Sequence, residues 1–208
     1  MELKIYNTGF LGINTYLLLD EDSKEAVVID LGGDYKAMKN DIDTLGYKLK
    51  FILNTHGHFD HLYGEVAFQK EFPEIPIYMH KKDMLHVGHI DVEMAMWGFD
   101  VDVKPITPSA FIDEDSELYI GRHRIQIFHT PGHSSGSLSY YVDGKLFSGD
   151  ALFQRSIGRT DFHDGNYDLL INSIKTKLLT LNDDTVVYPG HGPKTSIKDE
   201  KKYNTYLN

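Results

Sequence analysis

The sequence predicts an α/β fold in which two β-sheets lie face to face with helices on their outer faces. In both halves of the chain, short apolar segments bounded by glycine and polar clusters indicate strands. They are followed by segments with apolar residues three or four positions apart, which indicate helices. The length of 208 residues and the hydrophobic content of 41% fit one domain over residues 1–208 with an ordinary core.

The first half is expected to contain a strand–helix–strand unit. Asp34 can cap the helix of this unit, whose inner face would carry Met38, Ile42 and Leu45. The apolar run over 51–53 would then pair in parallel with the strand before the helix, and ligand-bearing loops lie at the carboxyl ends of such strands. The other elements predicted here are strands over 3–6, 16–19, 26–29 and 77–79 and helices over 64–72 and 81–87.

Residues 88–110 lack clear periodicity, although they include Met94, Met96 and the only tryptophan, Trp97. A long apolar segment of this kind is either a flap over a site or a loop packed on the core. We expect the packed loop.

The second half is expected to repeat the order of strands followed by a helix. A helix over 167–181 is predicted because Leu170, Ile174 and Leu178 fall four positions apart and Asn166 can cap the first turn. The strands predicted in this half cover 117–120, 124–128, 137–142, 145–147 and 185–188.

The charge of the chain argues against two classes of partner. Because 21 Lys and Arg face 31 Asp and Glu, the net charge is −10, and neither nucleic acid nor an anionic membrane is an expected partner. No apolar run approaches the ~20 residues that span a bilayer, and the first residues lack the apolar region of a signal peptide. We therefore expect a soluble, cytoplasmic protein. No sequence feature indicates an oligomeric state.

The chain has no cysteine but 11 histidines. Disulfide frameworks, thiolate zinc sites, iron–sulfur clusters and cysteine nucleophiles are thereby excluded. Metal chemistry in this protein has to use His, Asp and Glu.

The strongest motif, Thr-His-Gly-His-Phe-Asp-His, directly follows the predicted strand over 51–53. His56 and His58 can point to the same side of the loop and share a metal ion, whereas Asp60 and His61 can face a second one. A polar loop with chance histidines is the alternative, but the position after an apolar strand favours a metal site. Three further candidate ligands follow predicted strands and have glycine neighbours: His133, Asp150 and His191.

These motifs resemble the glyoxalase II-like branch of the metallo-β-lactamase-fold hydrolase superfamily over nearly the whole chain. The ending Gly-His-Gly-Pro-Lys-Thr resembles its short, single-domain bacterial members. The resemblance implies an αββα sandwich with metal ions at one edge. It further implies that one metal is held by His56, His58 and His133 and a second by Asp60, His61 and His191, with Asp150 bridging both.

Two divalent ions in such a site polarise a carbonyl or phosphoryl oxygen and make a bridging hydroxide available near neutral pH. Asp60, besides being a ligand, is the candidate catalytic residue that orients this hydroxide and handles its proton. Zinc is the first choice of metal, and iron or manganese also suits His and Asp ligands.

Three related classes of protein differ from this sequence in a metal ligand or in an added segment. The commonest di-zinc β-lactamases resemble this sequence in the first motif but have a cysteine ligand where Asp150 stands. Flavodiiron proteins have Glu at the position of His58. Transfer-RNA 3′ processing enzymes share the first motif but need a basic RNA-binding extension, which this acidic chain does not show.

The segment Gly-Arg-Thr-Asp at 158–161 resembles one that lies beside the active site in glyoxalase II-like enzymes and mono-iron persulfide dioxygenases. Arg159 could bind a carboxylate of the substrate with two hydrogen bonds. Alternatively, Arg159 pairs with Asp161 or a helix end in a structural role.

Asp30 ends an early strand and resembles an aspartate loop of the family, from which it could orient a ligand histidine; a helix-capping loop is the alternative. His163, close to Arg159, is a candidate for supporting the site. The remaining histidines are expected on the surface or in strands: His80, His86, His89, His123 and His129.

The expected function is a dinuclear metal-dependent hydrolase, a glyoxalase II-like thioesterase that acts on a small anionic acyl-thiol. The alternative is a mono-iron persulfide dioxygenase with His56, His133 and Asp150 as its only protein ligands. A non-catalytic metal-binding module is disfavoured because it has no need of an open hydroxide position.

Overall fold

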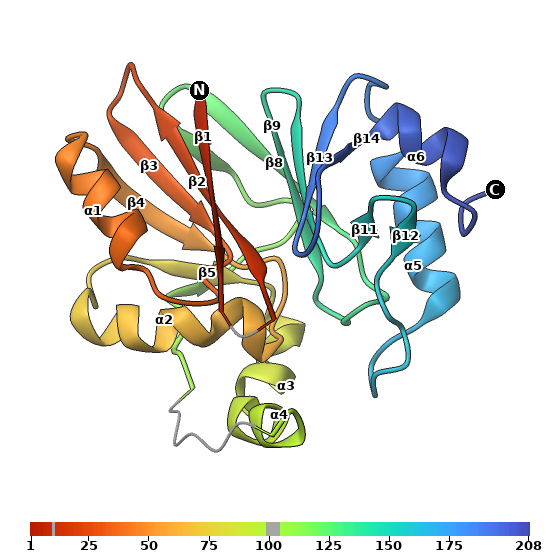
Figure 1. The fold of residues 1–208 in the computed structure, drawn as a ribbon, viewed down its shortest axis with the longest axis horizontal. Coiled ribbons are helices and arrows are strands. Elements are labelled where there is room, and N and C mark those ends of the chain that lie inside the picture. The colour runs from red at the N-terminus through yellow and green to blue at the C-terminus, as the bar shows by residue number, and fades with distance from the viewer. Residues whose placement is uncertain (10, 99–104) are drawn as a thin grey trace.

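The computed structural model describes residues 1–9, 11–98 and 105–208. In this part of the chain, two six-stranded β-sheets lie face to face, and helices cover the outer face of each (Figure 1). The arrangement confirms the predicted α/β class and the αββα sandwich.

The N-terminal sheet has the strand order β1-β2-β3-β4-β5-β6. β1, β2 and β3 pair in an antiparallel manner, whereas β3 to β6 run parallel. The parallel pairing of β3 with β4 across a helix was predicted and is confirmed. The strands are β1 Glu2–Thr8, β2 Ile13–Asp20, β3 Glu25–Ile29, β4 Lys48–Leu53, β5 Ile77–Met79 and β6 Ala110–Phe111.

The C-terminal sheet has the order β14-β13-β10-β9-β8-β7, and its neighbours are antiparallel except for β10 and β13. A small hairpin of β11 Leu152–Phe153 and β12 Ser156–Ile157 follows β10. The strands of the sheet are β7 Leu118–Ile120, β8 His123–His129, β9 Leu138–Val142, β10 Lys145–Gly149, β13 Val186–Pro189 and β14 Thr195–Ser196.

Helices α1 and α2 lie on the outer face of the N-terminal sheet, and α5 and α6 lie on that of the C-terminal sheet (Figure 1). α5 continues as a π-helical turn over Ile174–Leu178, so this helix ends three residues before the predicted position 181. Asn166 accepts a hydrogen bond from the backbone N–H of Leu169 and caps α5, as predicted. The helices are α1 Lys36–Thr44, α2 Phe59–Glu71, α3 Met84–Val87, α4 Ile90–Met96, α5 Tyr167–Ser173 and α6 Ile197–Tyr203.

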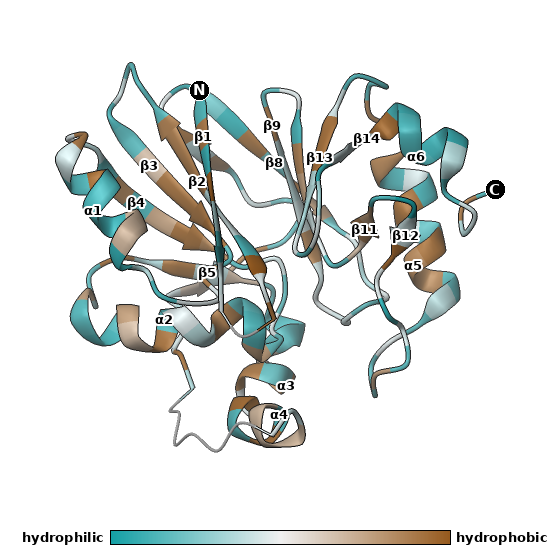
Figure 2. Cartoon of the chain, in the orientation of Figure 1, coloured by the Kyte–Doolittle hydropathy of each residue, from teal (hydrophilic) through white to brown (hydrophobic). Residues whose placement is uncertain are grey.

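The apolar residues form three layers, and Figure 2 shows them concentrated along the strands. In β2, Leu17 faces α1 and α2, whereas Leu18 faces the other sheet, because side chains alternate along a strand. Both faces are buried, which matches the apolar run over Tyr16–Leu19 in β2. The third layer packs Leu170, Ile174 and Leu178 against the C-terminal sheet, as their spacing predicted.

One detail of the first predicted helix is confirmed and one is wrong. The residue directly before α1 is Tyr35, but the Asp34 side chain accepts a hydrogen bond from the first N–H of the helix, that of Lys36, at 3.0 Å, and so caps it as predicted. Met38 and Ile42 are buried, but Leu45 follows the last turn, where it no longer faces the sheet, and is exposed.

The prediction that α2 begins near residue 64 is also wrong, since the helix begins at Phe59. Asp60 and His61 therefore lie in its first turn, on buried faces. Polar residues that face inward break the apolar pattern from which a helix is inferred.

Within 88–110 the predicted loop is replaced by helix α4. Ile90 and Met94 are buried in the core, whereas Met96 and Trp97 are largely exposed. Residues 99–104 lie outside the described part of the chain. Among the described residues, no helix is long and apolar enough to cross a membrane.

Candidate metal centre

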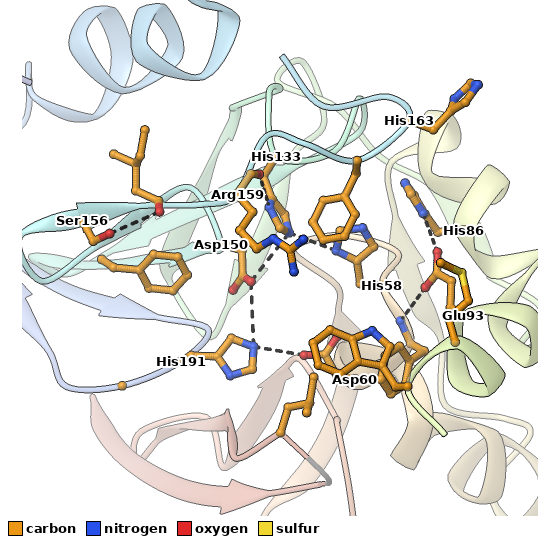
Figure 3. A pocket seen from close by; sticks show the side chains of 18 of the residues that line it. His58, Asp60, His86, Glu93, His133, Asp150, Ser156, Arg159, His163 and His191 are labelled. Carbon is orange, nitrogen blue, oxygen red and sulfur yellow. Dashed lines mark hydrogen bonds and ion pairs between the residues drawn. The ribbon is translucent and has the colours of Figure 1, made fainter. Parts of the chain in front are cut away.

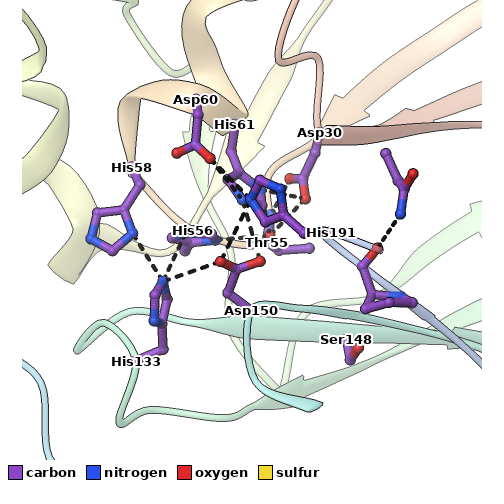
Figure 4. Close-up of polar contacts among 12 residues, drawn as sticks. Asp30, Thr55, His56, His58, Asp60, His61, His133, Ser148, Asp150 and His191 are labelled. Carbon is purple, nitrogen blue, oxygen red and sulfur yellow. Dashed lines mark hydrogen bonds and ion pairs between the residues drawn. The ribbon is translucent and has the colours of Figure 1, made fainter. Parts of the chain in front are cut away.

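The candidate ligands meet at one edge of the sandwich, where strands of both sheets end (Figure 4). His56 and His58 follow β4 of the N-terminal sheet, and Asp60 and His61 open α2. The C-terminal sheet contributes three residues that follow β8, β10 and β13: His133, Asp150 and His191.

The first cluster contains His56, His58 and His133, whose metal-binding atoms lie within 4.8 Å of one another. His133 Nε2 lies 2.9 Å from His58 Nδ1 and 3.3 Å from His56 Nε2. Nitrogen ligands of a tetrahedral zinc ion are about 3.3 Å apart, given zinc–nitrogen distances of about 2.0–2.1 Å. Burial, together with the neighbouring histidines, holds the pKa of His56 and His58 well below the ordinary value, which keeps their lone pairs available.

The second cluster contains Asp60, His61 and His191. His191 Nε2 lies 3.0 Å from Asp60 Oδ2, and His61 Nε2 lies 3.9 Å from the same oxygen. Burial lowers the pKa of His61, but the carboxylates of Asp30, Asp150 and Asp60 outweigh it, so the pKa lies well above the ordinary value. Negative charge at this position favours a cation, either a proton or a metal ion.

Asp150 lies between the two clusters (Figure 4). Its Oδ1 is 3.4 Å from His61 Nε2, and its Oδ2 is 3.6 Å from His133 Nε2 and 3.8 Å from His191 Nε2. Burial raises its pKa, but His61, His133 and His191 outweigh this effect, so the pKa falls below the ordinary range. A carboxylate whose oxygens lie near ligand nitrogens of both clusters is suited to bridge two metal ions.

Buried atoms without hydrogen-bond partners test the fit of the site to metals. In the described part of the chain, His61 Nε2 and Asp150 Oδ1, which face the clusters, are such atoms. Buried polar atoms are costly unless they are paired, and ligation by a cation satisfies an imidazole or carboxylate lone pair. The donor set therefore fits divalent metals, and the structure brings together all seven predicted ligands.

Neighbouring groups orient several of these histidines. His61 Nδ1 donates to Asp30 Oδ2 at 2.9 Å, and Thr55 Oγ1 donates to the same oxygen at 2.7 Å. His56 Nδ1 lies 3.1 Å from Thr55 Oγ1, to which it can donate. With its other nitrogen engaged in this way, each ring directs Nε2 to the metal centre. Of the two roles considered for Asp30, orienting a ligand histidine or forming a helix-capping loop, the contact with His61 supports the first.

The segment after β12 orients a third ligand. His133 Nδ1 donates to the backbone carbonyl of Arg159 at 2.8 Å. The Arg159 side chain pairs with Asp161 through two hydrogen bonds of 2.9 Å and lies over the ring of Phe162. Arg159 also lines the cavity described below. Its pair with Asp161 therefore does not prevent the guanidinium from reaching a molecule in the cavity.

Sequence reasoning missed Asp83, a buried carboxylate that ties together the loops of the first cluster. It accepts hydrogen bonds from Gly57 N at 2.8 Å, Gly136 N at 2.7 Å and Ser134 Oγ at 2.9 Å. Burial raises the pKa of Asp83 to about 6, although these three hydrogen bonds act to lower it. Gly57 lies between His56 and His58, so Asp83 holds both ligand loops in register. A lone Asp in a short helix carries no signal of this role.

The expectation that His86 is a surface or strand residue is wrong. His86 is buried in α3, its Nδ1 donates to Glu93 at 2.7 Å, and its Nε2 donates to Asp164 at 3.2 Å. Burial lowers the pKa of His86, but Glu93 and Asp164 outweigh it and raise the pKa to about 9. Its ring meets the ring of His58 edge-on, with 4.5 Å between the two ring centroids. Its partners are distant in sequence, so no local motif marked it.

A cavity of about 880 Å³ opens above the two clusters (Figure 3). Five of the seven candidate ligands line it: His58, Asp60, His133, Asp150 and His191. Arg159 and the exposed His163 also line it. A concave, mostly apolar space with a few convergent polar groups is typical of a small-molecule site.

Comparison with known proteins gives relatives along nearly the whole chain. The profile described as "Metallo-beta-lactamase superfamily" matches residues 8–191. The chain is 40% identical to the probable metallo-hydrolase YqgX of Bacillus subtilis, with 96% of this chain and 94% of that protein covered. It is 36% identical to the hydroxyacylglutathione hydrolase GloC of Haemophilus influenzae, with 92% and 91% covered.

Solved structures also include relatives that match nearly the whole chain. The BLEG-1 B3 metallo-beta-lactamase is 38% identical with a TM-score of 0.89, and 99% of each chain is covered. TTHA1623 in a di-iron-bound form is 34% identical with a TM-score of 0.87, covering 98% of this chain and 100% of that one. ETHE1 from Myxococcus xanthus is 29% identical with a TM-score of 0.79, covering 99% and 84%.

Members of this superfamily bind divalent metals at the sheet edge where the His and Asp residues of this chain converge. The αββα fold, the ligand pattern and relatives at up to 40% identity over nearly the full length agree. The chain therefore belongs to the metallo-β-lactamase superfamily, as a metal-dependent hydrolase.

Proposed function

We propose that the protein is a dinuclear hydrolase that cleaves the thioester bond of a small anionic acyl-thiol, like the hydroxyacylglutathione hydrolases. The observation that carries the proposal is the pair of adjoining clusters with Asp150 between them at the base of a cavity. The 36% identity to the hydroxyacylglutathione hydrolase GloC supports the reaction class.

Two metal ions are part of this proposal, with zinc as the first choice and iron or manganese as alternatives. His56, His58 and His133 would hold one ion, and Asp60, His61 and His191 would hold the other. The di-iron form of TTHA1623, at 34% identity, supports a two-metal site and makes iron the main alternative.

When bound, the ions would polarise the thioester carbonyl and lower the pKa of a water molecule towards neutrality. Asp60 lines the cavity and lies 3.0 Å from His191, so its carboxylate orients the attacking water and takes one proton from it. The hydroxyl oxygen forms a bond to the carbonyl carbon and the carbon–sulfur bond breaks. The proton then returns to the leaving thiolate, giving one carboxylic acid and one thiol.

Arg159 is proposed to bind the anionic group of the substrate. Its guanidinium carries five N–H donors, of which two bond to Asp161. The remaining donors are available at the cavity wall. Asp161 would then hold the guanidinium in place for one carboxylate.

The test is metal analysis of protein purified without added metal, followed by assays of lactoylglutathione beside other thioesters. Two metals per chain and thioester hydrolysis are expected. His58→Ala should lose metal and turnover together, because its Nδ1 lies 2.9 Å from His133 Nε2 at the first cluster. Full hydrolysis by a metal-free His58→Ala protein would refute the proposal.

A mono-iron persulfide dioxygenase is the second candidate, favoured by the likeness to ETHE1 from Myxococcus xanthus. It would use His56, His133 and Asp150 alone. One iron per chain and oxygen uptake with a glutathione persulfide would support it, and two metals per chain would count against it.

A further inference from the structure

The wall of the cavity above the metal centre is apolar on several sides. Apart from Phe59 and Pro193, its hydrophobic side chains come from three separate parts of the chain: the turn before β2, helices α3 and α4 with the residue that follows α4, and the segment that begins at β11. These residues are Leu11, Leu85, Met96, Trp97, Phe153, Ile157 and Phe162.

Several of these side chains are unusually exposed for their size. Met96 is 82% exposed and Trp97 is 50% exposed, although both follow the buried Met94 in sequence. Leu85 and Leu11 are also exposed. Exposed apolar side chains that gather around one concavity mark a surface that binds an apolar group.

The charges of the cavity lining also favour a ligand that is largely apolar. Among the lining residues that the structure describes, Arg159 is the only Lys or Arg, and Asp161 already pairs with it. Glu93 adds a negative charge on the α4 side of the cavity. One carboxylate of a substrate can reach Arg159. His86, whose pKa is raised to about 9, also lines the cavity, but both its ring nitrogens are engaged by Glu93 and Asp164. A second carboxylate would therefore find no free Lys, Arg or His86 donor among the described lining residues.

We infer that the substrate is an acyl thioester whose thiol arm is apolar and uncharged, aromatic or branched aliphatic, with at most one carboxylate in the molecule. This inference rests on the proposed thioesterase function. Because the proposed acyl group is small, the thiol arm is the part that fills the cavity and packs on Trp97 and Met96. A glutathione arm, with two carboxylates and an ammonium group, matches this wall poorly.

Binding can be measured without turnover because Trp97 is the only tryptophan of the chain. Its fluorescence reports on the cavity wall that it lines. The probes are (2-phenylethylthio)acetic acid, which carries one carboxylate and an aromatic arm, and S-methylglutathione. Neither contains a thioester, so the metal-loaded protein cannot hydrolyse them as it would a substrate.

We expect the phenylethyl probe to change the Trp97 emission and to bind at least about tenfold more tightly than S-methylglutathione, a ratio that apolar contacts of this size can supply. Trp97→Ala, followed by calorimetry, should remove most of this preference. The matched control is Val92→Ala, since Val92 is exposed on the same helix but does not line the cavity. It should keep the preference unchanged.

Equal or tighter binding of S-methylglutathione would overturn the inference, as would a preference that survives Trp97→Ala. Comparing lactoylglutathione with the lactoyl thioester of 2-phenylethanethiol separates this result from the proposed function. Hydrolysis with a preference for lactoylglutathione upholds the hydrolase and refutes the apolar arm. Tight binding of the phenylethyl probe without cleavage of any thioester refutes the hydrolase and upholds the apolar cavity.

Discussion

Gly190 sits where the two halves of the metal centre meet, and replacing it with alanine tests the proposed ligand geometry. A Cβ at Gly190 would overlap Asp150 Oδ1 and lie 2.7 Å from His61 Cε1. Ordinary contacts of a Cβ begin near 3.4 Å, so the His61 ring would have to move by about 0.7 Å and the Asp150 carboxylate further. The backbone of Gly190 does not have a positive φ, so the effect would be purely steric.

Displacements of this size exceed the roughly 0.2 Å tolerance of metal–ligand distances. We expect Gly190→Ala to retain less than two metals per chain, to lose about 100-fold in turnover and to lose about 1–3 kcal/mol of stability. Metal content, thioester hydrolysis and urea unfolding measure the three effects.

The matched control is Gly88→Ala, in which the added Cβ meets its nearest neighbour, the Met84 carbonyl oxygen, at 3.4 Å. This substitution should leave metal content and turnover intact and raise stability by about 0.4–1 kcal/mol, since alanine restricts the unfolded chain. A Gly190→Ala protein with two metals and wild-type turnover would show that Asp150 and His61 do not hold metal together.

Three further predictions follow from individual contacts. Asp30→Ala removes the acceptor of His61 Nδ1 and should weaken metal binding about 10–100-fold in a competition titration with a chelator. Asp83→Ala leaves buried donors such as Gly136 N unpaired and should lower the free energy of unfolding in urea by about 2–4 kcal/mol. Asp161→Ala releases the exposed Arg159 guanidinium that Asp161 holds in place and should raise the KM of carboxylate-bearing thioesters without changing the melting temperature. An unchanged value in the stated measurement would contradict each one.

The strands and the candidate ligands were the most predictable features. Residues 16–19 of β2 and the whole of β5 are short apolar runs, a pattern from which a buried strand can be predicted directly. The ligand residues stand in short motifs beside glycine. Glycine is required at Gly190 because Asp150 and His61 approach its backbone closely.

The features that were missed have identifiable physical causes. Helix α4 is apolar on two sides, because Met94 faces the core while Met96 lines the cavity, so no single apolar face is visible in the sequence. The first turn of α2 buries Asp60 for the metal centre and therefore reads as a polar loop. His86 is buried by partners 7 and 78 positions away, a pairing that only the tertiary structure reveals.

Each of the two ligand clusters takes residues from both sheets. His133 joins His56 and His58 in the first cluster, and His191 joins Asp60 and His61 in the second. A metal ion in either cluster therefore cross-links two parts of the chain that are distant in sequence, so its binding energy is available only after the sheets have docked. If the chain were cut between the sheets, for example within the turn at 114–115 that lies between β6 and β7, its fragments should reassociate more tightly when metal is present, and chelation should release them.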